Sequence, residues 1–178
     1  MSYVKGKIFV LTVSALSCLL LTSFIKQRFE KELPPPTHTG ENMMACKING
    51  KVIIAGQNLT NASGVVNFSS SPDKDLLYIS CEITSPHYEI ELSIDYDDTL
   101  GVYPIICSYP YFGYFWDYTH SISPNDSNQF QPDISHPGSV TVTYNDGNII
   151  AGTFAMEAVN RQGKVVHLTD GRFDIMAH

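Results

Sequence analysis

The densest group of side chains suited to binding lies between Tyr103 and Tyr118, where eight of sixteen residues are aromatic. Aromatic rings give rigid, amphipathic contact area at low entropic cost, so they serve as platforms for sugar rings and peptides. Pro104, Pro110 and Gly113 interrupt the run, which favours an aromatic loop at a binding edge. The alternative is that alternate rings fill a core while the tyrosine hydroxyls reach the surface. The residues that we expect to contact a ligand are Tyr111, Phe112, Tyr114 and Trp116.

The residue types used in catalysis and metal binding form no local motif. No two of the six histidines lie three or four residues apart, and nucleophile-elbow, Walker and dinucleotide motifs are absent. The acidic group 95–98 suggests calcium, but an EF-hand loop would need Gly at Leu100 and Glu at Ile106. We therefore predict no catalytic residue, no metal and no cofactor. The alternative is a hydrolase whose site forms only in the fold, where His120 or His136 would meet a carboxylate and a hydroxyl.

The chain begins with a pattern typical of bacterial export. Lys5 and Lys7 precede an uncharged, mostly apolar run over residues 8–25. The run holds 18 residues, and a membrane-spanning helix needs about 20. Three alternatives stay open: a signal cleaved after Ser23, a lipoprotein signal with Cys18 as the acylated residue, and an uncleaved anchor over residues 1–25. Each predicts an exported protein of the cell envelope, and two of them tether it to a membrane.

The next segment, residues 26–45, has the composition of a tether. Charges of both signs are followed by Pro34, Pro35 and Pro36 and then by small polar residues. Consecutive prolines favour an extended, stiff chain, and a polar segment buries too little apolar surface to order itself. We therefore predict a spacer over residues 26–45 and a single domain over residues 46–178.

The charge of the exported part excludes one class of partner. From Thr37 onward, six Lys and Arg face sixteen Asp and Glu, which gives a formal net charge of −10. Nucleic-acid binding depends on clustered Lys or Arg at the phosphates. The sequence therefore predicts no nucleic-acid partner.

Three cysteines, Cys46, Cys81 and Cys107, lie in the exported part. An oxidising compartment permits a disulfide there. A bond between Cys81 and Cys107 would contribute roughly 3 kcal/mol by closing a loop of this length, with Cys46 buried and free. The alternative is three buried, unpaired cysteines. The spacings match neither a zinc site nor a Cys-x-x-Cys redox motif.

The periodicity of the domain is that of β-strands. Short apolar or alternating runs are separated by turn residues such as Asp146-Gly147, and Asp170-Gly171 marks a further turn or a bulge. This pattern predicts an all-β domain, an antiparallel β-sandwich or a barrel-like sheet. The expected strands cover residues 47–55, 64–68, 76–83, 89–94, 139–144, 149–159, 165–168 and 172–176.

Two groups of motifs bracket the exported domain. The first reads Glu-Leu-Pro-Pro from residue 32 and Cys-Lys-Ile-Asn-Gly-Lys-Val from residue 46; the second reads Ala-Gly-Thr-Phe from residue 151 and Leu-Thr-Asp-Gly-Arg-Phe-Asp-Ile from residue 168. In these motifs the chain resembles an uncharacterised Bacteroidetes lipoprotein family, although residues 56–138 match nothing known to us. The resemblance implies a lipoprotein without an assigned activity. The family has a cysteine after its Leu-Thr-Ser motif, whereas Phe24 follows Ser23 here.

Three functions fit these observations. The first is a non-catalytic binding module that recognises a glycan, a peptide or an envelope partner through the aromatic segment. The second is a structural or assembly component of the envelope without a small ligand, and the third is the hydrolase. We expect the first.

Overall fold

The computed structural model describes residues 32–56, 64–71, 76–105, 107, 111–119 and 128–176, with only the backbone given for residues 64–71. The predicted signal or anchor over residues 1–25, including Cys18, lies outside the described residues. Among those described, no helix is long and apolar enough to cross a membrane. The strands are β1 (Met43–Ile48), β2 (Lys51–Gly56), β3 (Gly64–Ser71), β4 (Leu76–Thr84), β5 (His87–Asp95), β6 (Gly101–Ile105), β7 (Phe112–Asp117), β8 (Gln129–Phe130), β9 (Gly138–Asn145), β10 (Ile149–Val159) and β11 (Val165–Met176).

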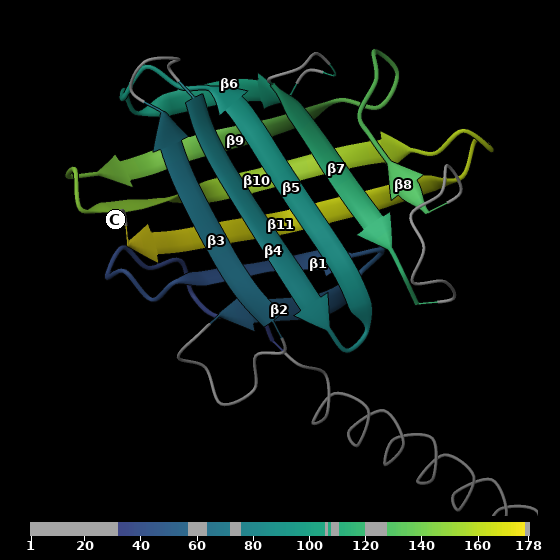
Figure 1. The fold of residues 1–178 in the computed structure, drawn as a ribbon, viewed down its shortest axis with the longest axis horizontal. Coiled ribbons are helices and arrows are strands. Elements are labelled where there is room, and N and C mark those ends of the chain that lie inside the picture. The colour runs from purple at the N-terminus through teal and green to yellow at the C-terminus, as the bar shows by residue number, and fades with distance from the viewer. Residues whose placement is uncertain are drawn as a thin grey trace, which may run out of the picture. The chain divides into compact units, whose positions relative to one another are not determined.

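These strands form two sheets, and every strand pairing is antiparallel. One sheet has six strands in the order β2-β1-β11-β10-β9-β6, and the other has five in the order β3-β4-β5-β7-β8. Figure 1 shows the five-stranded sheet lying in front of the six-stranded sheet, with the two sets of strands crossing. The predicted all-β, sandwich-like class of fold is therefore confirmed.

The two sheets share one hydrophobic core. Successive side chains of a strand point to opposite faces, so every second residue can be buried. In β4, Leu77, Ile79, Cys81 and Ile83 are each 1% exposed, while the residues between them are half-buried or exposed. The same core cluster includes Val140, Phe154 and Phe173 from the six-stranded sheet, together with other residues of both sheets.

The strands begin and end at turns, and one of these turns divides a predicted strand into two. A single strand over residues 47–55 is wrong, because Asn49 and Gly50 form a turn between β1 and β2. Their φ angles of 49° and 82° suit the Asn-Gly hairpin turn. The hairpin predicted at Asp146-Gly147 is confirmed. At Asp170 the strand continues as β11, and the pairing register shifts nearby, so the bulge alternative is the one observed.

The segment from Leu33 to Asn42, here called the N-terminal strap, differs from the predicted spacer. Residues Leu33–His178 form one compact unit, and β1 begins at Met43, so residues 43–45 belong to the domain. Leu33 packs against a second apolar cluster formed by Met43, Ala45 and Ile54. The domain therefore starts before residue 46.

Asp174 of β11 holds the strap. Its side chain is fully buried, and its carboxylate accepts hydrogen bonds from Thr37 Oγ1 at 2.6 Å, Thr39 N at 2.9 Å and Gly40 N at 2.8 Å. Nearby, Arg172 donates to the Pro34 carbonyl. Burial raises the pKa of Asp174, but the hydrogen bonds outweigh it, so the pKa lies below its ordinary value of 3.8. The polar strap is ordered because its hydrogen-bond partner lies more than 130 residues away in sequence.

We predict that Asp174→Ala destabilises the domain by about 3 kcal/mol, because buried donors of the strap lose a charged acceptor. The pKa of Asp174 is lowered by folding, so its contribution is present above about pH 4 and is lost as the pH falls through the folded-state pKa. Urea unfolding at pH 7 and in acid measures both effects.

The matched control is Asp170→Asn, which removes the charge of an exposed carboxylate that pairs with Lys47 at 2.8 Å and suits the left-handed backbone of this residue, whose φ is 53°. Exposed ion pairs contribute little to stability, so this control should change the unfolding midpoint much less. Equal effects of the two substitutions would contradict the role of Asp174 in holding the strap.

Candidate functional site

The aromatic segment is divided between the two sheets, which corrects the prediction of one aromatic loop. Residues 101–105 form β6 at the edge of the six-stranded sheet, and residues 112–117 form β7 inside the five-stranded sheet. In β7, Gly113 and Phe115 are buried, while Phe112, Tyr114 and Trp116 are half-buried. The strand alternation therefore places two residues in the core and three rings on the outer face.

These three rings and Tyr118 form what we call the aromatic row. Ring centroids are 4.9 Å apart between Phe112 and Tyr114, 6.1 Å between Tyr114 and Trp116, and 5.9 Å between Trp116 and Tyr118. The planes of the last pair are inclined by only 6°. In Figure 1 the outer face of this sheet is turned to the viewer, and no described element lies over it. The row is thus a continuous aromatic strip on a sheet face that no described element covers.

Three glutamates lie beside the aromatic row on β4 and β5, and we call them the glutamate trio. Glu82 pairs in register with Glu89, which pairs with Trp116. Glu91 pairs with Tyr114. The trio therefore lines the aromatic row across the neighbouring strands.

Two tyrosines orient these carboxylates. Tyr78 Oη donates a hydrogen bond to Glu91 at 3.0 Å, and Tyr118 Oη donates to Glu89 at 3.4 Å. The pKa of each tyrosine is raised to about 12, and burial is the largest cause. The negative charge of Glu91 raises the pKa of Tyr78 further, and that of Glu89 raises the pKa of Tyr118. Both hydroxyls therefore stay protonated near neutral pH and act as donors.

The trio is a site of charge repulsion. Burial raises the pKa of Glu89, and the charges of Glu91 and Glu82 raise it further, against the smaller effects of Tyr118 and His87. His87 Nε2 lies 3.7 Å from Glu82. The sequences of the five strands of this sheet contain no Lys or Arg. The face is therefore negative as well as aromatic.

The structure brings together three of the four predicted ligand-binding residues. Phe112, Tyr114 and Trp116 share the outer face, whereas Tyr111 is a half-buried residue that precedes β7. Tyr78, Tyr118 and the glutamate trio were not predicted as site residues from the sequence. The glutamates and Tyr78 alternate with apolar residues along short strands, and this pattern indicates that they share the outer face of the sheet. Only the pairing of the strands shows that they are neighbours of the aromatic row.

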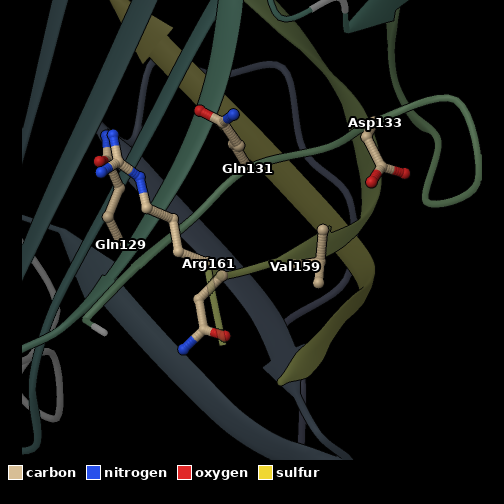
Figure 2. A pocket seen from close by; sticks show the side chains of 6 residues that line it. Gln129, Gln131, Asp133, Val159 and Arg161 are labelled. Atoms are coloured by element: carbon tan, nitrogen blue, oxygen red, sulfur yellow. The ribbon is translucent and has the colours of Figure 1, made fainter. Parts of the chain in front are cut away.

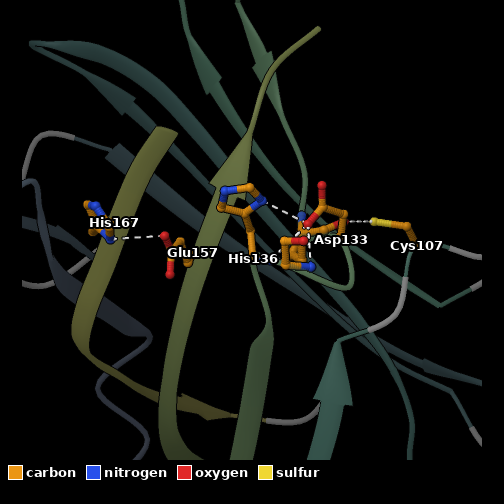
Figure 3. A network of polar contacts seen from close by, with 7 residues as sticks. Cys107, Asp133, His136, Glu157 and His167 are labelled. Carbon is orange, nitrogen blue, oxygen red and sulfur yellow. Dashed lines mark hydrogen bonds and ion pairs between the residues drawn. The ribbon is translucent and has the colours of Figure 1, made fainter. Parts of the chain in front are cut away.

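His136 contacts a carboxylate, and the Cys107 thiol is hydrogen-bonded to a different group. His136 Nδ1 lies 2.8 Å from Asp133 Oδ1, whereas Cys107 donates to the backbone carbonyl of Pro132 (Figure 3). Burial and then the charge of Asp133 raise the pKa of the Cys107 thiol, which opposes formation of a nucleophilic thiolate. The imidazole of His136 and the thiol of Cys107 therefore contact different partners. His120, the other histidine considered for a hydrolase, lies outside the described residues.

A small hollow lies beside β8 (Figure 2). Its volume of about 190 Å³ is below that of common ligand pockets, which are about 300–1,000 Å³. Asn160 in its wall accepts hydrogen bonds from the backbone of Gln162 and Lys164, so it stabilises the turn. The lining contains no hydroxyl or thiol nucleophile: it consists of Gln129, Gln131, Asp133, Val159, Asn160 and Arg161.

The acidic segment after β5 serves a turn. Asp97 Oδ1 accepts hydrogen bonds from Thr99 N, Thr99 Oγ1 and Tyr103 Oη, and the last two lie at 2.6 and 2.7 Å. Within the part of the chain that the structure describes, no group of three or more His, Cys, Asp or Glu is arranged to hold a metal ion.

The predicted disulfide between Cys81 and Cys107 is not formed. Cys81 points into the core from β4, whereas Cys107 is exposed beyond β6 and bonds to Pro132. Cys46, predicted to be buried and free, has both properties. The spacing of the cysteines does not report which side of a strand each one occupies, and this is why the prediction failed.

Comparisons with protein-family models, with curated proteins and with solved structures found no match for this chain. The resemblance to a Bacteroidetes lipoprotein family therefore stays a prediction.

We predict that iodoacetamide alkylates Cys107 in the native protein and leaves Cys46 and Cys81 unmodified. Cys107 is exposed and is therefore accessible to the reagent, although its raised pKa makes it react more slowly than a free thiol. Burial removes the other two thiols from the reagent and raises the pKa of Cys46 to about 12. Peptide mapping by mass spectrometry identifies each site, and denatured protein should be labelled at all three. A Cys81–Cys107 cross-link, or equal native labelling of Cys81, would contradict this assignment.

Gly113 is required where β7 approaches the opposite sheet. A Cβ at this position would lie 2.6 Å from Ile105 Cγ2 and 2.8 Å from Met156 Sδ. We predict that Gly113→Ala destabilises the domain by about 1–3 kcal/mol through overpacking. Gly101→Ala is the matched control, because its Cβ would meet nothing within 4 Å. Urea unfolding of the two variants should separate them, and equal midpoints would contradict the close approach of β7.

Proposed function

We propose that this chain is an exported, non-catalytic binding module of the bacterial cell envelope, and that it recognises its ligand through the aromatic row. The observation that carries the proposal is the row of Phe112, Tyr114 and Trp116 on β7 and Tyr118 directly after it, on a sheet face that no described element covers. A soluble domain loses little by placing polar residues on an outer sheet face, so adjacent half-buried rings there favour a binding role.

The architecture supports binding rather than catalysis. Three of the rings lie on β7, which pairs with β5 along its whole length, and this holds them more rigidly than a loop would. The His136–Asp133 pair and the Cys107 thiol are directed to different partners. Export is supported by the apolar run over residues 8–25 and by the resemblance described above.

The test uses the full-length chain in mild non-ionic detergent. Trp116 is the single tryptophan of the sequence, so its fluorescence reports directly on the row. The probes are a neutral β-linked hexasaccharide, short basic, acidic and neutral peptides, and purified peptidoglycan sacculi, whose binding is measured by cosedimentation. We expect at least one probe to bind wild type and to bind Phe112→Ala/Tyr114→Ala at least tenfold more weakly, because stacking surface is lost.

The matched control is Tyr144→Ala, which removes a half-buried tyrosine from β9 of the other sheet. This variant should bind like wild type, and thermal unfolding should show that all variants are folded. Absence of binding by every probe, or equal binding by the double variant, would overturn the binding role and favour the assembly component.

A further inference from the structure

We propose that the ligand of the aromatic row is cationic, and specifically an extended polypeptide segment that carries Lys or Arg at alternate positions. This inference rests on the proposed binding function and names the chemistry of its ligand. The glutamate trio selects the sign of the charge, and the rings provide the contact surface.

The first argument is the unfavourable arrangement of the carboxylates. Glu82 and Glu89 are directly paired across β4 and β5, and Glu91 is the next outward residue of β5. Like charges opposite one another weaken a sheet. A positively charged ligand removes this repulsion, a neutral ligand leaves it, and an anionic ligand increases it.

The second argument is the lack of Lys and Arg on the strands, where His87 of β5 lies 3.7 Å from Glu82 at one end of the trio. Lys and Arg are absent from the sequences of β3, β4, β5, β7 and β8. The Tyr78 hydroxyl donates one hydrogen bond to Glu91, and the Tyr118 hydroxyl donates one to Glu89. Since an ionised carboxylate has about four acceptor positions, both groups keep capacity for ligand donors.

The third argument is the chemistry of the neighbouring rings. Trp116 is paired in register with Glu89, and Tyr114 with Glu91. A Lys or Arg side chain can pack its apolar stem on such rings and direct its charge toward the carboxylates. Tryptophan is the strongest cation–π partner among the aromatic residues. The face therefore offers both parts of a basic side chain a matching surface.

The spacing fits an extended chain. Alternate residues of a strand lie about 6.6 Å apart, and this separation holds both for Glu89 and Glu91 and for alternate lysines of a bound strand-like peptide. The aromatic row from Phe112 to Tyr118 spans roughly 20 Å, which is the length of about six extended residues. A peptide with basic residues at every second position would place its charges along the trio.

The experiment titrates full-length chain in mild non-ionic detergent with the peptide acetyl-(Lys-Ser)₄-amide and follows Trp116 fluorescence. Equal-length Gly-Ser and Glu-Ser peptides and a neutral β-linked hexasaccharide are titrated in parallel. We expect the Lys-Ser peptide to bind more tightly than the other three. Its affinity should fall several-fold between 0.05 and 0.5 M NaCl, since salt shortens the range of charge attraction.

The decisive variant is Glu89→Gln/Glu91→Gln, which keeps the side-chain shape and an acceptor for each tyrosine hydroxyl. We expect it to bind the Lys-Ser peptide roughly tenfold more weakly than wild type, as the loss of two charge contacts implies. The matched control is Glu41→Gln/Glu157→Gln, which changes the net charge equally but lies outside the face; it should bind like wild type. Thermal unfolding establishes that both double variants are folded.

Each outcome separates this inference from the function on which it rests. Tighter binding of the hexasaccharide than of the Lys-Ser peptide, lost in Phe112→Ala/Tyr114→Ala, would overturn the cationic ligand and leave the binding function standing. Equal loss of peptide binding in both glutamine double variants would show attraction to an acidic protein and would also overturn it. Absence of binding by every probe, sacculi included, would overturn both proposals.

Discussion

The burial of one face of each sheet against the other is the constraint on which this structure depends. Fully buried apolar side chains contribute about 1.5–3 kcal/mol each, and the core draws them from both sheets. Phe115 of β7 packs against Phe130 of β8 with ring centroids 5.7 Å apart. Once Phe115 and Gly113 face inward, strand alternation turns Phe112, Tyr114 and Trp116 outward. The aromatic row is therefore a consequence of the register that fills the core.

The two outer faces of the domain differ in how they are covered. The N-terminal strap lies on the six-stranded sheet, where the buried Asp174 accepts its hydrogen bonds and Leu33 covers apolar residues of β1 and β2. No described element covers the five-stranded sheet in the same way (Figure 1). One sheet thus anchors the strap on its outer face, while the outer face of the other carries the aromatic row and the glutamate trio.

The available face combines features that are unfavourable for a surface with no partner. Half-buried rings lie beside Glu82, Glu89 and Glu91, and mutual repulsion contributes to the raised pKa of Glu89. Tyrosine hydroxyls relieve this only in part, because each donates a single hydrogen bond. A ligand that stacks on the rings and neutralises the carboxylates would use both features, and neither requires the protein to perform chemistry.

The sequence by itself determined the all-β class, the antiparallel turns such as Asp146-Gly147, and the aromatic content of the candidate site. These properties are local, because alternation and turn residues act within a few positions. Tertiary structure alone decided that the aromatic segment is split between two sheets, that Glu89 lies beside Trp116, that Cys81 and Cys107 point to different surroundings, and that Asp174 orders the strap. Each of these depends on residues far apart in the chain, whose contacts are set by strand pairing and by packing of the shared core.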